Sequence, residues 1–542
     1  MGGIWGDIDN KGVMTMQTKE QHIEAVKRGV GWAYSQLNWL TDEEATHATE
    51  VRDQLLRALS GKVNNSYLQN KLHQGTLSPG CTTCGDGTWS CLFINGLCTA
   101  DCFFCPLDGR MRKEHPPVTM GGIVFRSPED YADFVQKIGF KGVGFSGGES
   151  LLLYDTLLSF IRKLREKMGN DIYLWVYTNG DLADRDKLEG LKQAGLDEIR
   201  FNIAARGYTL YSVELALNFI DTVTVEIPAI PEDFEVVKAA LGAMESMSIH
   251  HLNLHQLLAT SCNYSALSHR NYTFLHHPVD DASISRVDWV PVLESEMTAL
   301  RLLLYAVENG ISLPINYCSL AYKRRLQGRG YRTRAAPLAQ RGFEDVTDSG
   351  YIRRLTIKGT STSLERLARV LAATGCPDSQ WSMSEDRSGL TIHPLLLQHI
   401  DTDDCSFTLS YFEAYLRATE HALPLRHTDT SDSLVTTSYY MTDLRNNNNP
   451  DETVHELILN PERAIVAARV LAAEYPRLSL VTIRSFQKLF IDKISQRGVL
   501  KWFSENYDIA TKGEIQGMAR EKDILMDLAT WEQVPAGFPE IY

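Results

Sequence analysis

The sequence contains no run of about eighteen or more apolar residues, and it does not open on a basic segment followed by an apolar one. We therefore expect neither a membrane span nor a secretion signal, and we expect a cytoplasmic protein. Cysteine is also sparse, with ten residues among 542. A chain of this length buries a large apolar core without a disulfide framework, so clustered thiols in a reducing compartment indicate a metal site.

A surplus of positive charge is missing as well, since the formal net charge is −14. This acidity argues against a nucleic-acid partner, because nucleic-acid-binding proteins normally carry a basic face. One local exception is the stretch YKRRLQGRGYRTRA, which is either a solvated helix face or a site for an anionic group. Its basic residues are Lys323, Arg324, Arg325, Arg329, Arg332 and Arg334.

Composition and periodicity divide the chain into four regions. Helix formers and a scarcity of turn residues predict an N-terminal helical region that ends near Pro79 and Gly80. An alternation of strand and helix patterns follows, then a small β-α-β unit, then a mainly helical extension that includes the low-complexity stretch RNNNNPDE. The predicted bounds of these regions are 1–75, 76–335, 345–400 and 401–542.

The second region holds seven strand candidates separated by helical patterns. One helix is predicted to start at Ser127 as N-cap with Pro128 in its first turn, and another by the apolar stripe from Leu157 to Met168. Because βα alternation demands a parallel sheet, we predict a (β/α) barrel or partial barrel with its chemistry at the carboxyl ends of the strands. The strand candidates are CLFI, VGFSG, IYLWVYTNG, EIRFNIA, TVTVEIPAI, HLNLHQL and SLPINY.

Three cysteines with C-x3-C-x2-C spacing follow the first strand candidate directly: Cys98, Cys102 and Cys105. Thiolates this close can converge on one cluster. A four-iron four-sulfur cube of the ferredoxin type uses four cysteines. Three cysteines would therefore leave one iron open for an exogenous molecule.

This motif, with an aromatic residue, Phe104, before its last cysteine, resembles that of the radical S-adenosylmethionine (SAM) superfamily. The resemblance extends to Gly147, Gly148 and Glu149 at the end of the next strand, which match a GGE motif whose backbone and acid contact the SAM amino group. It implies a four-iron four-sulfur cluster whose open iron is chelated by SAM.

Further polar residues at predicted strand ends are candidates for the same site. By the resemblance, Thr178 and Asn179 would reach the ribose or the substrate, and Arg200 and Asn202 the SAM carboxylate or hydroxyls. Each could instead be a satisfied structural polar group. Glu226 either contacts a ligand or forms a salt bridge.

A narrower resemblance covers roughly residues 75–335. The runs SPGCTTCGDGTWSCLFINGLC, AGLDEIRFN and INYCSLAYKRRLQ are similar to those of a group described as related to pyruvate formate-lyase activating enzyme. The run HLNLHQL departs from that group, so His255 and Gln256 leave the substrate side open.

The upstream cysteines suggest a second metal site. Cys81 and Cys84 form a C-x2-C knuckle that can grip one tetrahedral metal, and Cys91 and Cys318 are the candidates for completing it. The expected metal is iron or zinc. The alternative is a set of reduced, packed thiols.

The resemblance implies an enzyme that cleaves SAM reductively, usually to a 5′-deoxyadenosyl radical, and acts on an unidentified small-molecule or peptide substrate. It also implies an electron donor such as flavodoxin or ferredoxin. The basic stretch is the candidate site for an anionic group of that substrate. Three alternatives stay open: transfer of a methyl or aminocarboxypropyl group from SAM, activation of a glycyl-radical enzyme, and a non-catalytic zinc-binding module.

Overall fold

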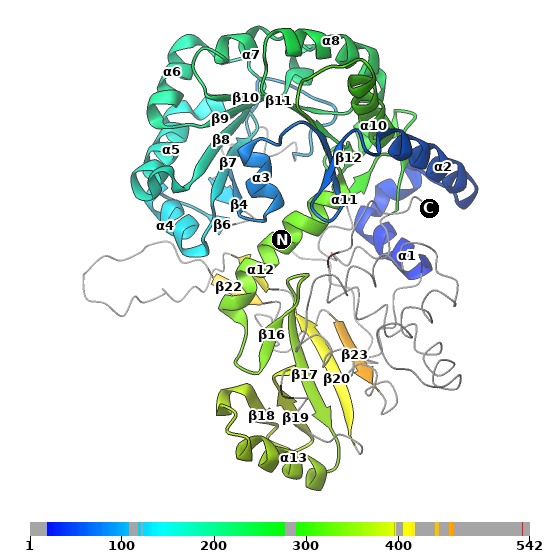
Figure 1. The fold of residues 1–542 in the computed structure, drawn as a ribbon, viewed down its shortest axis with the longest axis vertical. Helices are drawn as coiled ribbons and strands as arrows, with labels where there is room; N and C mark the ends of the chain where they lie inside the picture. The colour runs from blue at the N-terminus through cyan, green and yellow to red at the C-terminus, as the bar shows by residue number, and fades with distance from the viewer. Residues whose placement is uncertain are drawn as a thin grey trace. The chain divides into compact units, whose positions relative to one another are not determined.

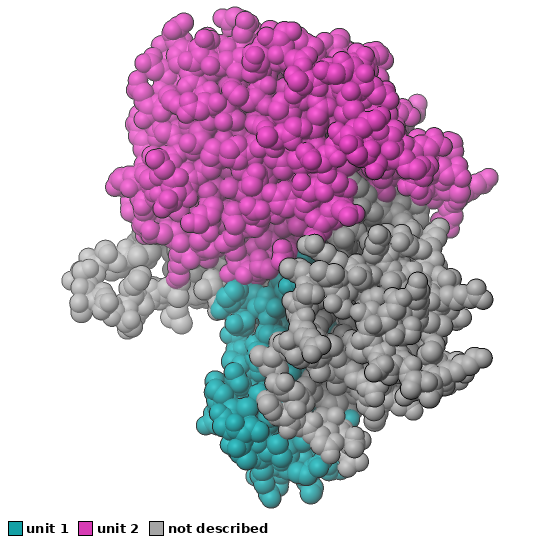
Figure 2. Space-filling view, in the orientation of Figure 1, with its two compact units in different colours: residues 1–18, 335–415, 441–534 teal, residues 19–334, 416–440, 535–542 magenta. Residues whose placement is uncertain are grey.

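The computed structural model describes residues 19–107, 118–120, 123–276, 289–394, 396, 405–412, 414–417, 440–443, 455–459 and 534. They divide into two compact units (Figure 2). The larger, called the barrel unit below, is built on residues 19–334, and the smaller, called the small unit, on residues 335–415 together with the described residues within 441–534.

An eleven-stranded sheet forms the barrel unit, and seven of its strands are parallel neighbours in the order β4, β7, β8, β9, β10, β11 and β15. These are the seven predicted strands. Since the strand order runs from one edge to the other without returning, the barrel is open, and the predicted partial barrel is confirmed. Their bounds are Trp89–Asn95, Gly142–Gly147, Tyr173–Thr178, Glu198–Phe201, Thr222–Pro228, His251–His255 and Ile315–Cys318.

Short antiparallel strands extend both edges of this sheet. Beyond β4 lie β5 (Thr119–Met120) and β6 (Ile123–Val124). Beyond β15 lie β3 (Lys71–Gln74) and β2 (Asn64–Ser66). The region predicted as helical over 1–75 therefore contributes strands to the barrel sheet. The reason is that Lys71, Leu72 and His73 are buried against β15, which overrides the local helix preference.

Helices cover the outer face of the sheet (Figure 1). The predicted N-cap is confirmed, because Asp130 N donates to Ser127 Oγ at 3.1 Å, and the helix stops at Gly139 in the left-handed region with φ 76°. Leu157, Ile161 and Leu164 are fully buried on the core side of the next helix. The covering helices are α4 (Pro128–Ile138), α5 (Tyr154–Met168), α6 (Arg185–Ala194), α7 (Tyr211–Ala216), α8 (Phe234–Ser246) and α10 (Leu293–Glu308).

A second apolar cluster lies apart from the main barrel core. It joins Val26 and Val30 of the N-terminal helix to Leu257 and Tyr264, which come from the segment between β11 and α10. The elements around it are α1 (Lys19–Val30), η1 (Gly31–Gln36), β1 (Asn38–Trp39), α2 (Asp42–Leu59), β12 (Leu258–Ala259), α9 (Tyr264–Ser268), β13 (Thr273–Phe274) and β14 (Val290–Pro291).

The small unit is an antiparallel sheet in the order β18, β19, β17, β20 and β23, with β16 also beside β17. The predicted β-α-β unit is present as β17, α13 and β19, but its strands pair antiparallel. The bounds are β16 Glu344–Val346, β17 Ile352–Lys358, α13 Ser361–Ala373, β18 Trp381–Met383, β19 Gly389–Ile392, β20 Ser406–Phe412 and β23 His455–Leu459.

The mainly helical extension predicted for 401–542 is wrong for the residues that are described. They form β20, β21 (Ala414–Arg417), β22 (Tyr440–Asp443) and β23, because β20 and β23 find partners on the sheet begun by β17. The low-complexity stretch at 445–452 lies outside the described residues. Within the described part of the chain, no helix is long and apolar enough to cross a membrane.

Candidate cofactor site and barrel interior

The loop with the three cysteines leaves the carboxyl end of β4 and lies against the end of β7. Gly148 N donates to Asn95 O at 2.8 Å, and Glu149 N donates to Leu97 O at 2.6 Å. A Cβ at Gly147 or Gly148 would overlap with the carbonyl oxygens of Asn95 and Leu97, and Gly147 has φ 140°. The glycines are thus required for the close approach of the cysteine loop to β7.

Glu149 is fully buried and has three intramolecular donors. Its Oε1 accepts from Leu151 N at 3.0 Å and from Thr178 Oγ1 at 2.8 Å, and its Oε2 accepts from Asn179 N at 2.7 Å. Burial raises the pKa of Glu149, and the three hydrogen bonds work in the opposite direction. The expected contact of this carboxylate with the SAM amino group gains no support, since the side chain instead ties β7 to the end of β8.

Asn179 connects the end of β8 to the cysteine loop. Its Nδ2 donates to Thr99 Oγ1 at 3.0 Å and to Cys98 Sγ at 3.6 Å, while Asp181 N donates to its Oδ1 at 2.9 Å. Ala100 N also donates to Cys98 Sγ, at 3.4 Å. Hydrogen bonds to a ligating sulfur stabilise its electron-rich form and so tune the redox potential of a cluster.

We expect Asn179→Ala to lower the midpoint potential of a reconstituted cluster by about 20–65 mV, the equivalent of one hydrogen bond of about 0.5–1.5 kcal/mol for a one-electron couple. Iron content should stay unchanged. Redox titration monitored by electron paramagnetic resonance (EPR) measures the shift. Asn218→Ala is the control, because Asn218 is exposed and its side chain donates to the nearby carbonyls of Glu214 and Leu215 on the same outer helical turn. An unchanged potential in Asn179→Ala would contradict the role.

Three buried polar atoms at the same rim lack a hydrogen-bond partner: Asn95 Oδ1, Ser150 Oγ and Asn202 Oδ1. They follow or end β4, β7 and β9, whose carboxyl ends share one edge of the sheet. Unpartnered buried polar atoms are rare and costly in proteins, so these atoms are suited to a ligand with hydroxyl or amino groups. Of these three residues, Asn202 is also predicted from the sequence to contact the cofactor, and its Oδ1 is free to accept a hydrogen bond from a ligand.

Arg200, predicted to bind the SAM carboxylate, is instead occupied by protein groups. It donates to Glu198 Oε1 at 2.8 Å, to Glu226 Oε2 at 2.9 Å and to Ser78 Oγ at 3.2 Å, and only 4% of its side chain is exposed. Although burial opposes ionisation, His255 and Arg200 hold the pKa of Glu226 well below its usual range. Glu226 therefore follows the salt-bridge alternative.

A short helix, α3 (Pro79–Gly85), lies on the concave side of the sheet, surrounded by its strands (Figure 1). Two glycines make room for the groups packed there, since a Cβ at Gly80 would overlap with Arg200 and one at Gly144 would lie 2.7 Å from Trp175 Nε1. This helix carries Cys81 and Cys84 into the barrel interior.

The structure brings three of the four upstream cysteines into one neighbourhood. Cys81 Sγ and Asn316 Nδ2 lie 3.6 Å apart, Gln327 Nε2 donates to Cys84 Sγ at 2.7 Å, and Lys71 Nζ donates to Cys318 Sγ at 3.7 Å. Burial first, and the neighbouring Cys318 next, raise the pKa of Cys84 to about 12.

Cys91 does not join these thiols. It donates to Ser146 Oγ at 3.3 Å, and its strand β4 is separated from β15, which carries Cys318, by five other strands. Among the described residues, no group of three or more His, Cys, Asp or Glu side chains is arranged to hold a metal ion. The geometry therefore lends no support to the four-cysteine site. Cys98, Cys102 and Cys105 are likewise not arranged around a common metal position among the described residues. Their proposed role as cluster ligands depends on their spacing in the sequence and their place after β4.

Two other expected residues have structural partners. The Phe104 carbonyl accepts from Asn263 Nδ2 at 3.1 Å, and the Phe104 ring packs in the second apolar cluster. Leu320 N donates to Gln256 Oε1 at 3.0 Å.

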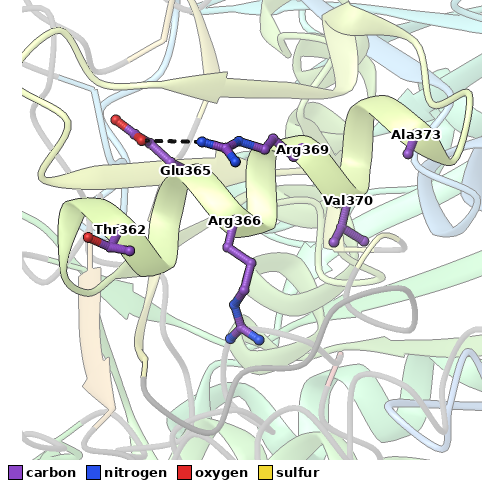
Figure 3. Close-up of a pocket in the computed structure, with 6 residues that line it drawn as sticks. All are labelled: Thr362, Glu365, Arg366, Arg369, Val370 and Ala373. Atoms are coloured by element: carbon purple, nitrogen blue, oxygen red, sulfur yellow. Dashed lines mark ion pairs between the residues drawn. The ribbon is translucent and has the colours of Figure 1, made fainter.

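A hollow of about 350 Å³ lies elsewhere, along one face of α13 in the small unit (Figure 3). Glu365 and Arg369, one helical turn apart on α13, pair at 3.8 Å. It contains none of the predicted site residues. Its lining is Thr362, Glu365, Arg366, Arg369, Val370 and Ala373.

Residues 92–207 match the family model described as the Radical SAM superfamily. A protein of Methanocaldococcus jannaschii named as a glycyl-radical enzyme activating enzyme is 29% identical over 317 residues, which cover 56% of this chain and 80% of that protein. A protein of Pyrococcus horikoshii named as a GTP 3′,8-cyclase is 27% identical over 158 residues, covering 28% of this chain and 45% of that protein.

Among solved structures, SuiB of Streptococcus suis bound to S-adenosylmethionine matches with a TM-score of 0.31 and 12% identity, covering 43% of this chain and 50% of that chain. The chain thus spans half the length of this solved structure.

Proposed function

Through residues 92–207 this chain belongs to the radical SAM superfamily of enzymes, and we propose that it directs radical chemistry at a substrate that carries an anionic group. When bound, the four-iron four-sulfur cluster and SAM supply a carbon-centred radical that takes a hydrogen atom from the substrate. Cys98, Cys102 and Cys105 are proposed to hold the cluster. Asn202 and Ser150 are proposed to orient SAM through their open polar atoms.

Two lysines near His255, Lys71 and Lys323, support the proposal that the substrate carries an anionic group. Lys71 is 1% exposed, and its Nζ lies 3.9 Å from the centre of the Tyr322 ring. Lys323 Nζ donates to His255 Nδ1 at 2.9 Å, and His255 Nε2 donates to Glu226 Oε1 at 2.9 Å. In the described part of the chain, neither lysine pairs with a carboxylate.

The charges around His255 and Cys81 leave an excess of one positive charge. The groups that act most strongly on these two residues include three cations, Arg200, Lys71 and Lys323, and two carboxylates, Glu198 and Glu226. Burial, followed by Lys323, lowers the pKa of His255, which is therefore neutral near pH 7. An unpaired buried charge is costly, so one substrate carboxylate or phosphate would offset it.

Lys323 is the residue of the basic stretch that acts on His255. Arg324 Nη2 donates to Trp289 O at 2.9 Å, Arg325 Nη1 to Asn70 Oδ1 at 2.9 Å, and Arg334 Nε to Gly87 O at 2.7 Å. These arginines have structural contacts. Lys323 opens the π-helix η7 (Lys323–Gln327), a helix type that is frequent at functional sites.

We expect crystals soaked in sodium bromide to show an anomalous bromine peak beside Lys323 Nζ and Lys71 Nζ, because bromide is an anion that an uncompensated ammonium retains. Lys323→Met should remove most of the peak. Lys238→Met is the control, since Lys238 lies on the outer helix α8 and is paired with Glu235 at 3.1 Å. The absence of bromide from the unsubstituted protein would contradict an anionic subsite.

Identification of the nucleoside released from SAM under anaerobic reducing conditions tests the reaction class. We expect 5′-deoxyadenosine. Methylthioadenosine would instead indicate aminocarboxypropyl transfer, and S-adenosylhomocysteine methyl transfer. A reductant of the flavodoxin or ferredoxin type is the proposed electron donor.

Activation of a glycyl-radical enzyme is the second candidate, because the relative from Methanocaldococcus jannaschii is named for that activity. It would require a protein substrate with a reactive glycine. Formation of a glycyl radical in a partner protein, detected by EPR, would favour it over a small-molecule substrate. A purely structural zinc-binding module is set aside, since the chain belongs to a family of enzymes.

A further inference from the structure

The cysteine loop is also held by the segment that connects β11 to α10. Phe103 and Phe104 lie between Cys102 and Cys105, so any group that fixes these two aromatic residues also fixes the flanking cysteines. Two polar side chains of the connecting segment do so, Asn263 and Arg270.

Arg270 covers the ring of Phe103. Its Cζ lies 3.5 Å from the ring centre, and its Nη1 pairs with Glu232 Oε1 at 2.9 Å. Tyr272 OH donates to the second oxygen of Glu232 at 2.6 Å. The guanidinium is thus fixed by a carboxylate while its face meets an aromatic ring, an arrangement that suits arginine better than lysine.

Asn263 holds the backbone next to Cys105. Its Nδ2 donates to Phe104 O at 3.1 Å and to Leu258 O at 3.2 Å, and Thr260 N donates to its Oδ1 at 2.8 Å. The side chain is 3% exposed. Because the amide is itself held by a tight turn, it fixes the position of the Phe104 carbonyl relative to the barrel.

Apolar packing completes the clamp. Phe103 and Phe104 meet edge to face at 5.2 Å and pack against the second apolar cluster, which contains Val30, Leu257 and Tyr264. This cluster is separate from the main core of the barrel. The loop is therefore held at Cys98 by Asn179, at the end of β8, and at Phe103 and Phe104 by the segment between β11 and α10.

We propose that Arg270 and Asn263 are positioning residues that set the places of Cys102 and Cys105 before a cluster binds. The inference depends on the proposed role of the three cysteines as ligands. A loop ordered in advance loses less conformational entropy when its thiolates bind a cluster, so the clamp should favour cluster retention.

The test measures thiol alkylation by iodoacetamide in the cluster-free protein, resolved for each cysteine by mass spectrometry. In Arg270→Ala we expect Cys102 and Cys105 to react about two- to fivefold faster, the change that corresponds to loss of one exposed cation–π contact. In Asn263→Ala we expect an increase of about two- to twelvefold, the change that corresponds to loss of one hydrogen bond. Cys376, a partly exposed thiol of the small unit, is the internal reference and should not change.

Two further variants separate positioning from general destabilisation. Arg270→Lys keeps a cation near Phe103 and Glu232 and should recover part of the protection. Lys238→Ala removes a comparable cation, which lies over Phe234 and Tyr305 and pairs with Glu235, from the outer surface, and should leave both rates unchanged. After reconstitution, Arg270→Ala should lose iron to a chelator faster than Lys238→Ala.

Unchanged alkylation of Cys102 and Cys105 in Arg270→Ala and Asn263→Ala would overturn the proposal, and so would an equal increase at Cys376 or in Lys238→Ala. Failure of the proposed function is distinguishable from these results. It would appear as iron retained after replacement of all three cysteines, whatever the alkylation rates.

Discussion

Replacement of Cys98, Cys102 and Cys105 together by alanine is expected to remove about four irons per chain and to abolish SAM cleavage. The loop after β4 contains no other cysteine. The three sulfurs would hold three irons of the cube, and the fourth iron would be left open for SAM. Iron and sulfide analysis after anaerobic reconstitution, with assay of the nucleoside product, measures both effects.

The matched control replaces three cysteines that have other surroundings, Cys91, Cys262 and Cys376. Cys91 contacts Ser146, Cys262 contacts Ser261 and Cys376 contacts Thr374. This variant should keep its iron. Retention of about four irons per chain by the variant that lacks Cys98, Cys102 and Cys105 would show that the cluster is held elsewhere.

Glu149→Gln is expected to destabilise the barrel unit and to reduce cluster content, with loss of SAM binding as a consequence. The carboxylate accepts from Leu151 N, Thr178 Oγ1 and Asn179 N. A glutamine amide group turns one acceptor into a donor, so at least one buried donor loses its partner. Hydrogen bonds to a charged group are worth about 1.5–3 kcal/mol each, which makes a loss of about 2–5 kcal/mol reasonable.

Thermal unfolding of the cluster-free protein measures this loss directly, because a residue that only bound SAM would leave the unfolding temperature unchanged. For a unit built on residues 19–334 we expect a decrease of about 3–8 °C. Glu166→Gln is the control, since that side chain is 69% exposed and pairs with Lys163 on the surface. If Glu149→Gln unfolds at the normal temperature and keeps its full iron content but binds SAM more weakly, the result would support the direct contact between Glu149 and the SAM amino group that the GGE motif predicts.

The interior thiols show how far spacing alone can mislead. Three of the four cysteines do lie together on the concave side of the sheet. Their sulfurs, however, contact protein side chains there: Cys81 contacts Asn316, Cys84 contacts Gln327 and Cys318 contacts Lys71. The fourth expected ligand lies on β4, remote from β15. A C-x2-C pair predicts that two thiols lie close to each other. Whether a third or fourth thiol lies nearby depends on which strands are neighbours in the sheet.

Local patterns in the sequence determined the seven parallel strands, the N-cap at Ser127 and the place of the three cysteines after the first strand, because strand period, helix period and capping act over a few residues. Tertiary structure alone decided the partners of buried polar groups. Glu149 meets Thr178, Arg200 meets Glu226, and Phe103 meets Arg270 from a segment more than 160 residues away. It also decided that the described residues after 401 form strands, since a sheet edge offered them hydrogen bonds that their own sequence could not supply.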